Sequence, residues 1–238
     1  MIKKNILCTI CARKGSKGLK NKNFLNLLGK PLIVHTIDQA KKVKFLTKIV
    51  VSSNSKKIID ISKNKIDYCI KRPEKLSNDH SSKVDVIKHA LIEAEKKFKL
   101  KFNTIIDLDI TSPLRSSSDI EKALKIFLKK KYENLVSGSI ARKNPFFNQV
   151  MYRGRYLDLV CNSKKKIVRR QNAPIIYDLN ASIYIWRRKN LMQSKKLITR
   201  KTTLFKMPYI KSIDIDDQYD FNIVKFILKK KLNKWKKK

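Results

Sequence analysis

Short apolar runs alternate with longer amphipathic stretches along most of the chain. Five runs have the length and composition of buried strands: Asn5–Ile10, Lys48–Ser52, Ile66–Lys71, Thr104–Asp109 and Leu135–Ile140. A sixth run, Ala181–Trp186, predicts another core strand. Strands separated by helices predict an α/β fold, with a mostly parallel sheet covered by helices on both faces. Ligands of such sheets bind beyond the carboxyl ends of the strands.

The stretches between these runs have helical periodicity. Apolar residues recur at spacings of three and four in two of them, at Val84, Ile87, Leu91, Ala94 and Phe98 and at Ile120, Ala123, Leu124, Phe127 and Leu128. Ser118 and Glu121 have the spacing of a capping box, which predicts the start of the second helix. Gln218–Lys230 predicts a closing helix, and the lysine-rich tail from Lys229 to Lys238 predicts its solvated end.

This alternation breaks between Asn144 and Arg170. Two adjacent aromatic residues, Phe146 and Phe147, precede a glycine turn and a polar stretch. The change of pattern indicates a β-rich excursion inserted into a single domain that spans residues 1–238. No internal repeat and no low-complexity linker divides the chain.

Charge adds a second kind of information. The formal net charge is +38, from 57 Lys and Arg against 19 Asp and Glu. Lysines outnumber arginines by 46 to 11 and are scattered over all the expected surfaces. Specific readers of nucleic acid rely instead on Arg for bidentate contacts. We therefore expect no specific nucleic-acid partner, and keep a basic nucleic-acid-binding protein as an alternative. The same charge would attract polyanionic substrates such as nucleoside triphosphates.

Two further classes are disfavoured by short local features. No apolar run reaches the roughly 18 residues of a membrane span, and the run Ile6–Ile10 is too short for a signal peptide. We expect a cytoplasmic protein without a membrane span. Cys8 and Cys11 close an apolar strand, and no second pair completes a zinc site, so buried structural cysteines are favoured.

The first predicted strand runs into a basic loop that contains two glycines, Cys11–Asn23. Backbone amides and cations in such a loop can wrap a triphosphate. The loop matches neither the Walker A motif nor G-x-G-x-x-G, so a solvated basic turn is the alternative.

A pair of carboxylates lies near the end of the chain, in Ser212–Asp217. In a strand, Ile213 and Ile215 would face the core while Asp214 and Asp216 shared the other face. Two such carboxylates can hold Mg²⁺ together with substrate phosphates. The alternative is a solvent-facing acidic patch.

Two more polar loops follow predicted strands. One is Asp107–Arg115, which a proline fixes before a helix begins, and the other is Arg72–Lys83. Ligand contacts gather at strand ends in α/β sheets, whereas ordinary turn chemistry explains the same residue types without a ligand.

Together these residues resemble the acylneuraminate cytidylyltransferases, or CMP-sialic acid synthetases. The resemblance covers nearly the whole chain. It rests on five ordered blocks: Ala12-Arg-x-x-Ser-Lys-Gly with Lys22-Asn23, Arg72-Pro-x-x-Leu-x-x-Asp, Thr111-Ser-Pro-Leu-Arg115, Arg169-Arg-Gln171 with Asn180-Ala-Ser-Ile-Tyr184, and Ser212-Ile-Asp-Ile-Asp216.

This resemblance implies a Rossmann-like nucleotidyltransferase fold and a homodimer formed through a small inserted subdomain, residues 144–182. It also implies CTP and a nonulosonic acid as substrates and Mg²⁺ as cofactor. By matching position it places Arg13, Lys17, Lys22 and Asn23 along the CTP phosphates and ribose, and Arg72, Lys83 and Asp109 at the nucleotide. It places Asp214 and Asp216 on Mg²⁺. The sugar would be contacted by Asp109, Phe147, Arg170 and Tyr184.

Departures from the sialate-making branch concern the sugar. That branch usually has Gln where Asp109 stands, Lys where Phe147 stands and Arg-Pro-Asn-Gly where Asp178-Leu-Asn-Ala occurs. The blocks Asp107-Leu-Asp, Asn144-Pro-Phe-Phe-Asn and Tyr177-Asp-Leu-Asn-Ala-Ser look more like the branch that acts on legionaminic-type sugars.

The reaction that the resemblance implies is metal-assisted nucleotidyl transfer. Mg²⁺ on the two carboxylates, with Lys17 and Lys22, would neutralise charge as pyrophosphate departs. The anomeric hydroxyl of the sugar, positioned by Arg170, would attack the α-phosphorus in line. Asp109 and a hydroxide on the metal are both open as the general base. A ketodeoxyoctonate cytidylyltransferase is the nearest alternative, which the first-loop and Arg169-Arg-Gln blocks disfavour.

Overall fold

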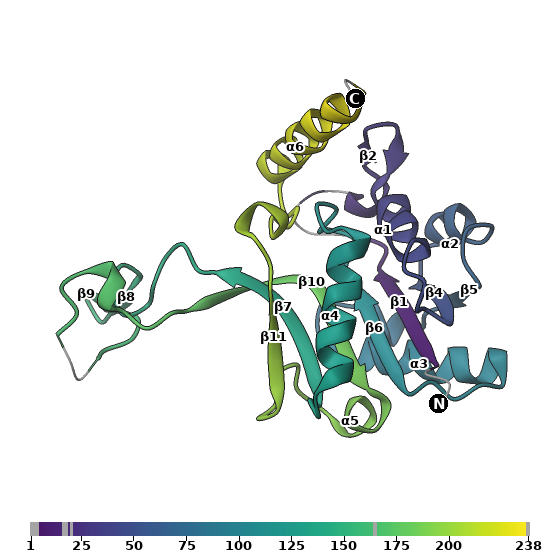
Figure 1. Cartoon of the computed structure of the whole chain (residues 1–238), viewed down its shortest axis with the longest axis horizontal. Coiled ribbons are helices and arrows are strands. Elements are labelled where there is room, and N and C mark those ends of the chain that lie inside the picture. Colours follow the sequence, from purple (N-terminus) through teal and green to yellow (C-terminus); the bar gives the residue numbers. More distant parts are fainter. Residues whose placement is uncertain (1–4, 16–18, 20, 164–165, 237–238) are drawn as a thin grey trace.

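The computed structural model describes residues 5–15, 19, 21–163 and 166–236. A seven-stranded sheet forms the body of the molecule, in the spatial order β11-β7-β10-β6-β1-β4-β5 (Figure 1). Its strands are β1 (Ile6–Ala12), β4 (Lys48–Ser53), β5 (Tyr68–Lys71), β6 (Thr104–Leu108), β7 (Asn134–Ile140), β10 (Tyr177–Arg187) and β11 (Thr202–Lys206). Among these described strands β10 alone runs antiparallel to its neighbours, so the predicted mostly parallel sheet is confirmed.

Helices cover both faces of this sheet. Adjacent residues of β1, Leu7 and Cys8, belong to two separate apolar clusters, because alternate side chains of a strand point to opposite faces. The cluster of Cys8 includes side chains of α1 (Leu32–Lys41), α2 (Lys56–Ser62), α4 (Ser117–Lys129) and α6 (Gln218–Lys236), and that of Leu7 includes α3 (Lys83–Phe98) and α5 (Arg188–Gln193). Burial on both faces explains why the strands read as continuous apolar runs.

Helix α4 begins two residues before the predicted position. Its capping residue is Ser116, whose side chain accepts a hydrogen bond from the backbone of Asp119 while the Asp119 carboxylate accepts one from the backbone of Ser116. The capping box expected at Ser118 and Glu121 is therefore wrong. Two pairs with the same spacing overlap here, and tertiary contact selects the first, because the ammonium of Lys211 lies 2.8 Å from the buried Asp119 carboxylate.

A long arm leaves the body between β7 and β10 (Figure 1). The arm consists of residues 141–163 and 166–176 and carries a hairpin of β8 (Val150–Arg153) and β9 (Tyr156–Leu159). The chain then rejoins the main sheet, where Tyr177–Leu179 pairs with Gly138–Ile140 of β7. The excursion expected over 144–182 thus ends earlier, and its last residues belong to β10.

The remaining elements are short. They are η1 (Lys22–Phe24), β2 (Asn26–Leu27), β3 (Lys30–Pro31), η2 (Glu74–Leu76), η3 (Arg170–Asn172) and η4 (Tyr209–Lys211). In the part of the chain that the structure describes, no helix is both long and apolar enough to cross a lipid bilayer.

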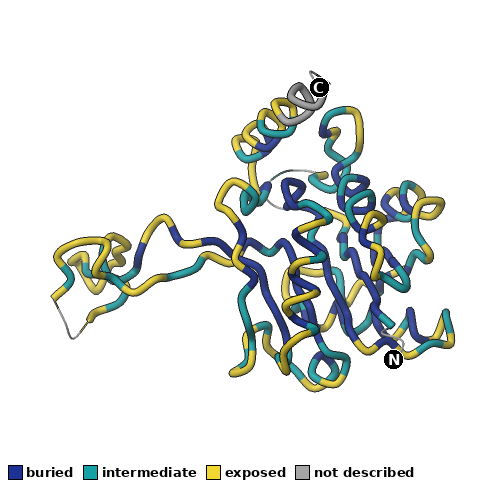
Figure 2. The backbone as a smooth tube through the Cα atoms, viewed as in Figure 1, coloured by how far each residue is buried: buried dark blue, intermediate teal, exposed yellow. Residues whose placement is uncertain are grey.

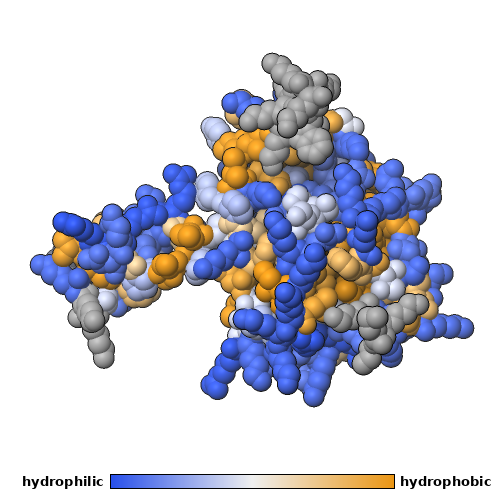
Figure 3. Space-filling model, in the orientation of Figure 1, coloured by the Kyte–Doolittle hydropathy of each residue, from blue (hydrophilic) through white to orange (hydrophobic). Residues whose placement is uncertain are grey.

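Burial differs sharply between the body and the arm. The strands of the body are buried along most of their length, whereas the arm beyond its root is exposed or only partly buried (Figure 2). The arm exposes large apolar side chains, among them Val150, Met151, Tyr152, Tyr156, Leu157, Val168 and Ile175. Figure 3 shows hydrophobic residues near the root of the arm, while hydrophilic side chains cover the lower end of the body.

Candidate active site

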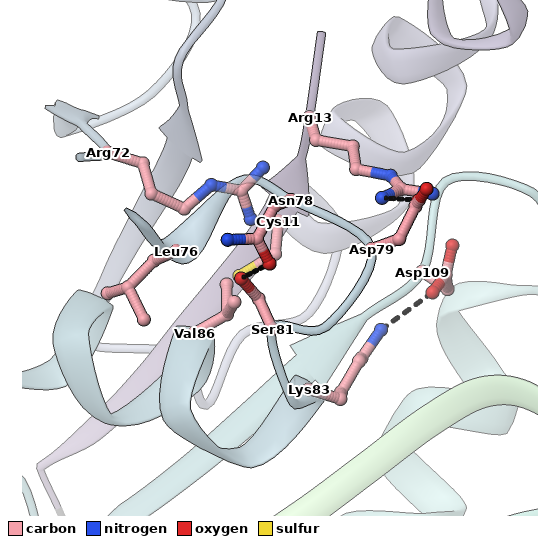
Figure 4. A pocket seen from close by; sticks show the side chains of 10 residues that line it. All are labelled: Cys11, Arg13, Arg72, Leu76, Asn78, Asp79, Ser81, Lys83, Val86 and Asp109. Carbon is pink, nitrogen blue, oxygen red and sulfur yellow. Dashed lines mark hydrogen bonds and ion pairs between the residues drawn. The ribbon is translucent and has the colours of Figure 1, made fainter. Parts of the chain in front are cut away.

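A pocket of about 280 Å³ opens beyond the carboxyl ends of β1, β5 and β6 (Figure 4). Its lining comes from the loops after these strands and from the first turn of α3: Cys11, Arg13, Arg72, Leu76, Asn78, Asp79, Ser81, Lys83, Val86 and Asp109. The sheet order places β4 on one side of β1 and β6 on the other, so the pocket lies at the topological switch point. Four of the residues predicted for nucleotide binding therefore meet in one cavity.

Arg72 supplies a buried cation with free donors. The residue is only 5% exposed, and its buried Nε and Nη2 atoms have no hydrogen-bond partner. Burial lowers the pKa of the Arg72 guanidinium. Leaving charged donors unpaired in a cavity is costly, so an acceptor from a ligand would remove that cost.

The first loop contributes a second cation at the pocket mouth. Arg13 Nη1 donates to Asp79 Oδ1 at 2.5 Å. Asn23 does not line the pocket; its amide nitrogen donates instead to the backbone oxygen of Arg13 at 3.1 Å, which shapes the loop. Lys17 lies outside the described residues, so its predicted role stays a prediction.

Lys22 joins the first loop to the acidic segment near the end of the chain. Its ammonium donates to the backbone oxygen of Ile215 at 2.6 Å and to Asp216 Oδ1 at 3.0 Å. Two of the motifs that the sequence singled out, almost 200 residues apart, are thus in direct contact.

The segment Ser212–Asp217 forms no strand, so that expectation is wrong. A backbone hydrogen bond from Ile215 to the oxygen of Thr111 anchors the segment at the edge of the site, whereas a strand would need a ladder of such bonds to a neighbouring strand. Ile215 is fully buried, as predicted. Asp214 is partly buried and the side chain of Asp216 is 76% exposed.

The carboxylate of Asp214 has the properties of a cation ligand. Burial raises the pKa of Asp214 to about 6, and the nearby carboxylates of Asp109 and Asp216 act in the same direction. Its Oδ1 atom is buried and has no hydrogen-bond partner. Among the described residues no cluster of three or more His, Cys, Asp or Glu side chains could hold a metal. Mg²⁺ needs only one or two carboxylates besides water and phosphate, so Asp214 with Asp216 fits it.

Lys83 lies between two carboxylates. Its ammonium is 2.6 Å from Asp109 Oδ2 and 3.0 Å from Asp107 Oδ2. Burial alone would lower the pKa of Lys83, but the two acids raise it well above its usual value. Burial would likewise raise the pKa of Asp109, yet Lys83 and hydrogen bonds from Thr111 lower it to about 2. Lys83 and Asp109 are therefore both charged near neutral pH.

The predicted sugar contacts are not brought together within one chain. Tyr184 is 6% exposed and lies against Lys83, with the ammonium 4.8 Å from its ring centroid, so it does not line the pocket. Phe147 and Arg170 both lie on the arm, where the Arg170 Nη2 donates to the backbone oxygen of Ala141 at 3.3 Å. In Figure 1 the arm extends to the left, away from the main sheet.

Arg115 is a residue whose function the sequence left unassigned. It is buried, and its guanidinium donates to the backbone oxygens of Ser182 at 2.6 Å and Asp109 at 3.1 Å. These bonds hold the loop after β6 against a bulge in β10, where Ala181 has a φ of 51°. The Ser-Pro-Leu-Arg block therefore shapes the site from beneath. In the sequence it is indicated by the proline-fixed loop after a predicted strand and by the resemblance.

Comparison with known proteins agrees with this geometry. The chain is 40% identical over 227 residues to a post-translational flagellin modification protein B of Campylobacter coli, covering 95% of this chain and 96% of that one. It is also 40% identical over 224 residues to a CMP-N,N'-diacetyllegionaminic acid synthase of Campylobacter jejuni, covering 94% of each.

A solved structure of a CMP:2-keto-3-deoxy-manno-octonic acid synthetase complexed with CTP matches with a TM-score of 0.69. The match covers 95% of this chain and 99% of that one at 17% identity, which shows a shared fold. The predicted Rossmann-like nucleotidyltransferase fold is confirmed. The family model described as cytidylyltransferase matches residues 7–227, and the chain belongs to this family of nucleotidyltransferases.

Proposed function

We propose that this enzyme transfers CMP from CTP to a nonulosonic acid and releases pyrophosphate. The observation that carries the proposal is the pair of unpartnered nitrogens on buried Arg72, in a pocket that also contains Arg13 and Lys83. A ligand that is both anionic and rich in hydrogen-bond acceptors fits such a pocket, and a cytidine triphosphate has both properties.

The cations that would bind the triphosphate now pair with acids. Arg13 contacts Asp79, and Lys22 contacts Asp216. Phosphate oxygens would replace these acids as partners, which frees Asp216 for the metal. Mg²⁺ bound by Asp214 and Asp216 would stabilise the charge that develops as pyrophosphate leaves.

The sugar subsite is best explained by a homodimer. Phe147 and Arg170 were predicted at the sugar but lie on an arm that projects from the body. Apolar side chains on that arm are strongly exposed, with Tyr152 and Tyr156 each at 72%. A second copy that packs against the arm would bury them, and its own arm could bring the same residues to this pocket. The Arg170 guanidinium suits the carboxylate of a nonulosonic acid.

Legionaminic-type sugars are the substrates we favour within this class. Relatives named as CMP-N,N'-diacetyllegionaminic acid synthases are 40% and 32% identical to the chain. Such sugars are 9-deoxy and carry an extra acylamino group, so an apolar wall at Phe146 and Phe147 suits them better than a hydroxyl-rich side chain. We expect a kcat/KM for the legionaminic-type acid about tenfold above that for N-acetylneuraminic acid.

The substitution Phe147→Lys tests this choice, since it places a cation where the ring stands. It should shift the ratio of the two kcat/KM values toward N-acetylneuraminic acid. A wild-type preference for N-acetylneuraminic acid would refute the assignment. A variant that becomes monomeric would show instead that Phe147 belongs to the interface.

Two alternatives have weaker support. The ketodeoxyoctonate reaction rests on likeness of fold at 17% identity. Nucleic-acid binding rests on the net charge alone, and its affinity should fall steeply between low and physiological salt.

The decisive experiment measures pyrophosphate release from CTP with Mg²⁺ across a panel of legionaminic, pseudaminic, N-acetylneuraminic and ketodeoxyoctonic acids. We expect turnover that depends on the acid and is highest with a nine-carbon substrate. The proposal would be contradicted if pyrophosphate release were the same without any sugar acid, or if it were highest with the eight-carbon acid.

A further inference from the structure

Asp107 is a carboxylate buried in the middle of the main sheet. It lies on β6, directly opposite Thr9 of β1 and Tyr184 of β10, so the three side chains share one face of the sheet. The Asp107 side chain has no exposed surface. Burying a carboxylate costs several kcal/mol, and an apolar residue of similar size would suit a central strand better for stability. A role other than packing should therefore explain this residue.

The contacts of Asp107 point to Lys83. One carboxylate oxygen accepts a hydrogen bond from Thr9 Oγ1 at 2.6 Å, which fixes the orientation of the group. The other oxygen forms an ion pair with the Lys83 ammonium at 3.0 Å and has no hydrogen-bond partner. Asp109 contacts the same ammonium at 2.6 Å from the pocket side, and the ring of Tyr184 lies beneath it.

Three fixed groups thus define where the ammonium sits. A lysine side chain is flexible, and holding it in one place costs rotamer entropy. An ammonium has three N–H donors. Two of them can face the carboxylates, which leaves the third for an oxygen of a ligand in the pocket. Without Asp107 the ammonium would be free to turn toward Asp109 alone.

We propose that Asp107 is a positioning residue that fixes the Lys83 ammonium at the floor of the pocket and thereby sets the affinity for CTP. The proposal rests on the proposed function for the identity of the ligand. It assigns Asp107 an action through Lys83, without contact to substrate.

The substitution Asp107→Asn tests this role, because it keeps the size of the side chain and an acceptor for Thr9 while it removes the charge. Calorimetry with CTP alone should show an affinity about tenfold weaker, as expected when one hydrogen bond to a charged group is lost. The KM for CTP should rise by a similar factor, and kcat should change by less than about threefold.

A double-mutant cycle separates positioning from general damage. If Asp107 acts through Lys83, the variant with both Asp107→Asn and Lys83→Met should bind CTP no more weakly than Lys83→Met alone. Losses that add would overturn the proposal. Lys83→Gln replaces Lys83→Met in the cycle if the latter fails to fold.

Glu95→Gln is the matched control. Glu95 is also a buried carboxylate in an ion pair, with its side chain 6% exposed and Arg188 at 2.8 Å. It contacts the start of α5, however, and does not line the pocket. Its variant should lose thermal stability and keep the wild-type CTP affinity. An equal loss of CTP affinity in both variants would mean that Asp107 has only a structural role.

The outcomes also separate this proposal from the proposed function. Unchanged CTP binding in Asp107→Asn, with a wild-type enzyme that forms CMP-sugar, refutes the positioning role alone. If the wild-type enzyme binds CTP but converts none of the sugar acids into a CMP-sugar, the proposed function is refuted. The CTP calorimetry then still decides the role of Asp107.

Discussion

The pocket and the arm differ in which side chains they bury: the pocket buries charged groups, and the arm exposes apolar ones. At the pocket, charged groups such as Lys83, Asp107 and Asp109 are held by partners from several strands of the same chain. On the arm, apolar groups such as Tyr156 and Leu157 are 72% and 59% exposed, with β8 and β9 pairing only with each other. In the described part of the chain, these charged groups of the pocket thus have partners from the same chain, whereas the apolar side chains of the arm stay exposed.

This difference separates the two halves of the proposed reaction. Nucleotide binding should depend on the body alone, and transfer to the sugar should depend on the arm as well.

The largest effect is expected at the metal site. Asp214→Asn should lower kcat at least about a hundredfold, because the buried carboxylate oxygen without a partner is the group best placed to bind Mg²⁺. Pyrophosphate release at saturating CTP and Mg²⁺ measures the effect. Asp38→Asn, which removes a surface carboxylate paired with Lys30, is the control and should retain activity. Full activity in Asp214→Asn would remove this residue from the metal site.

Arg72→Met should weaken CTP binding about a hundredfold, since two hydrogen bonds to a charged group are worth about 3 kcal/mol together. The melting temperature without ligand should not fall, because the substitution removes unpaired buried donors. Arg188→Met is the control with the opposite expected effects, because the Arg188 guanidinium is paired with Glu95. It should lower the melting temperature and leave CTP binding intact. A destabilised Arg72→Met with normal CTP binding would show that Arg72 is structural.

Charges on the arm should separate the two half-reactions. The double variant Tyr152→Asp with Leu157→Asp should sediment as a monomer where the wild type sediments as a dimer, because it places carboxylates in the proposed interface. Turnover should fall about tenfold or more while CTP affinity stays unchanged. Ile198→Asp, at a 50% exposed position on the body, should alter neither. A dimeric double variant would exclude the arm from the interface.

The smallest effect is a pH dependence of stability at Asp109. Its pKa in the folded state is about 2, below the roughly 3.9 of an unfolded chain, so ionised Asp109 stabilises the fold above about pH 4. This contribution, about 2 kcal/mol, is lost as the pH falls from about 4 to 2. Comparing the free energy of unfolding of wild type and Asp109→Asn over this range measures it. A difference that does not shrink toward pH 2 would mean that the Lys83 contact does not lower this pKa.

The sequence by itself determined the body of the protein. Apolar runs and helical spacings are local properties, and they predicted five parallel strands and the helices α3 and α4 within a few residues. Motif order also predicted that residues of the first loop, such as Arg13, and of α3, such as Lys83, serve one site. The predicted start of α4 was wrong because two serines, Ser116 and Ser118, both have the spacing of a helix cap. The contact between Lys211 and Asp119 decided between them.

Only the tertiary structure decided what depends on distant partners. The contact of Lys22 with Asp216 spans 194 residues, and no spacing rule connects them. The burial of Asp107 and Arg115 likewise follows from which strands are neighbours in the sheet. The arm is the clearest case: the sequence indicates a β-rich excursion, but only the fold shows that its apolar side chains are exposed. Periodicity specifies which face of an element is apolar, and the arrangement of elements specifies what that face meets.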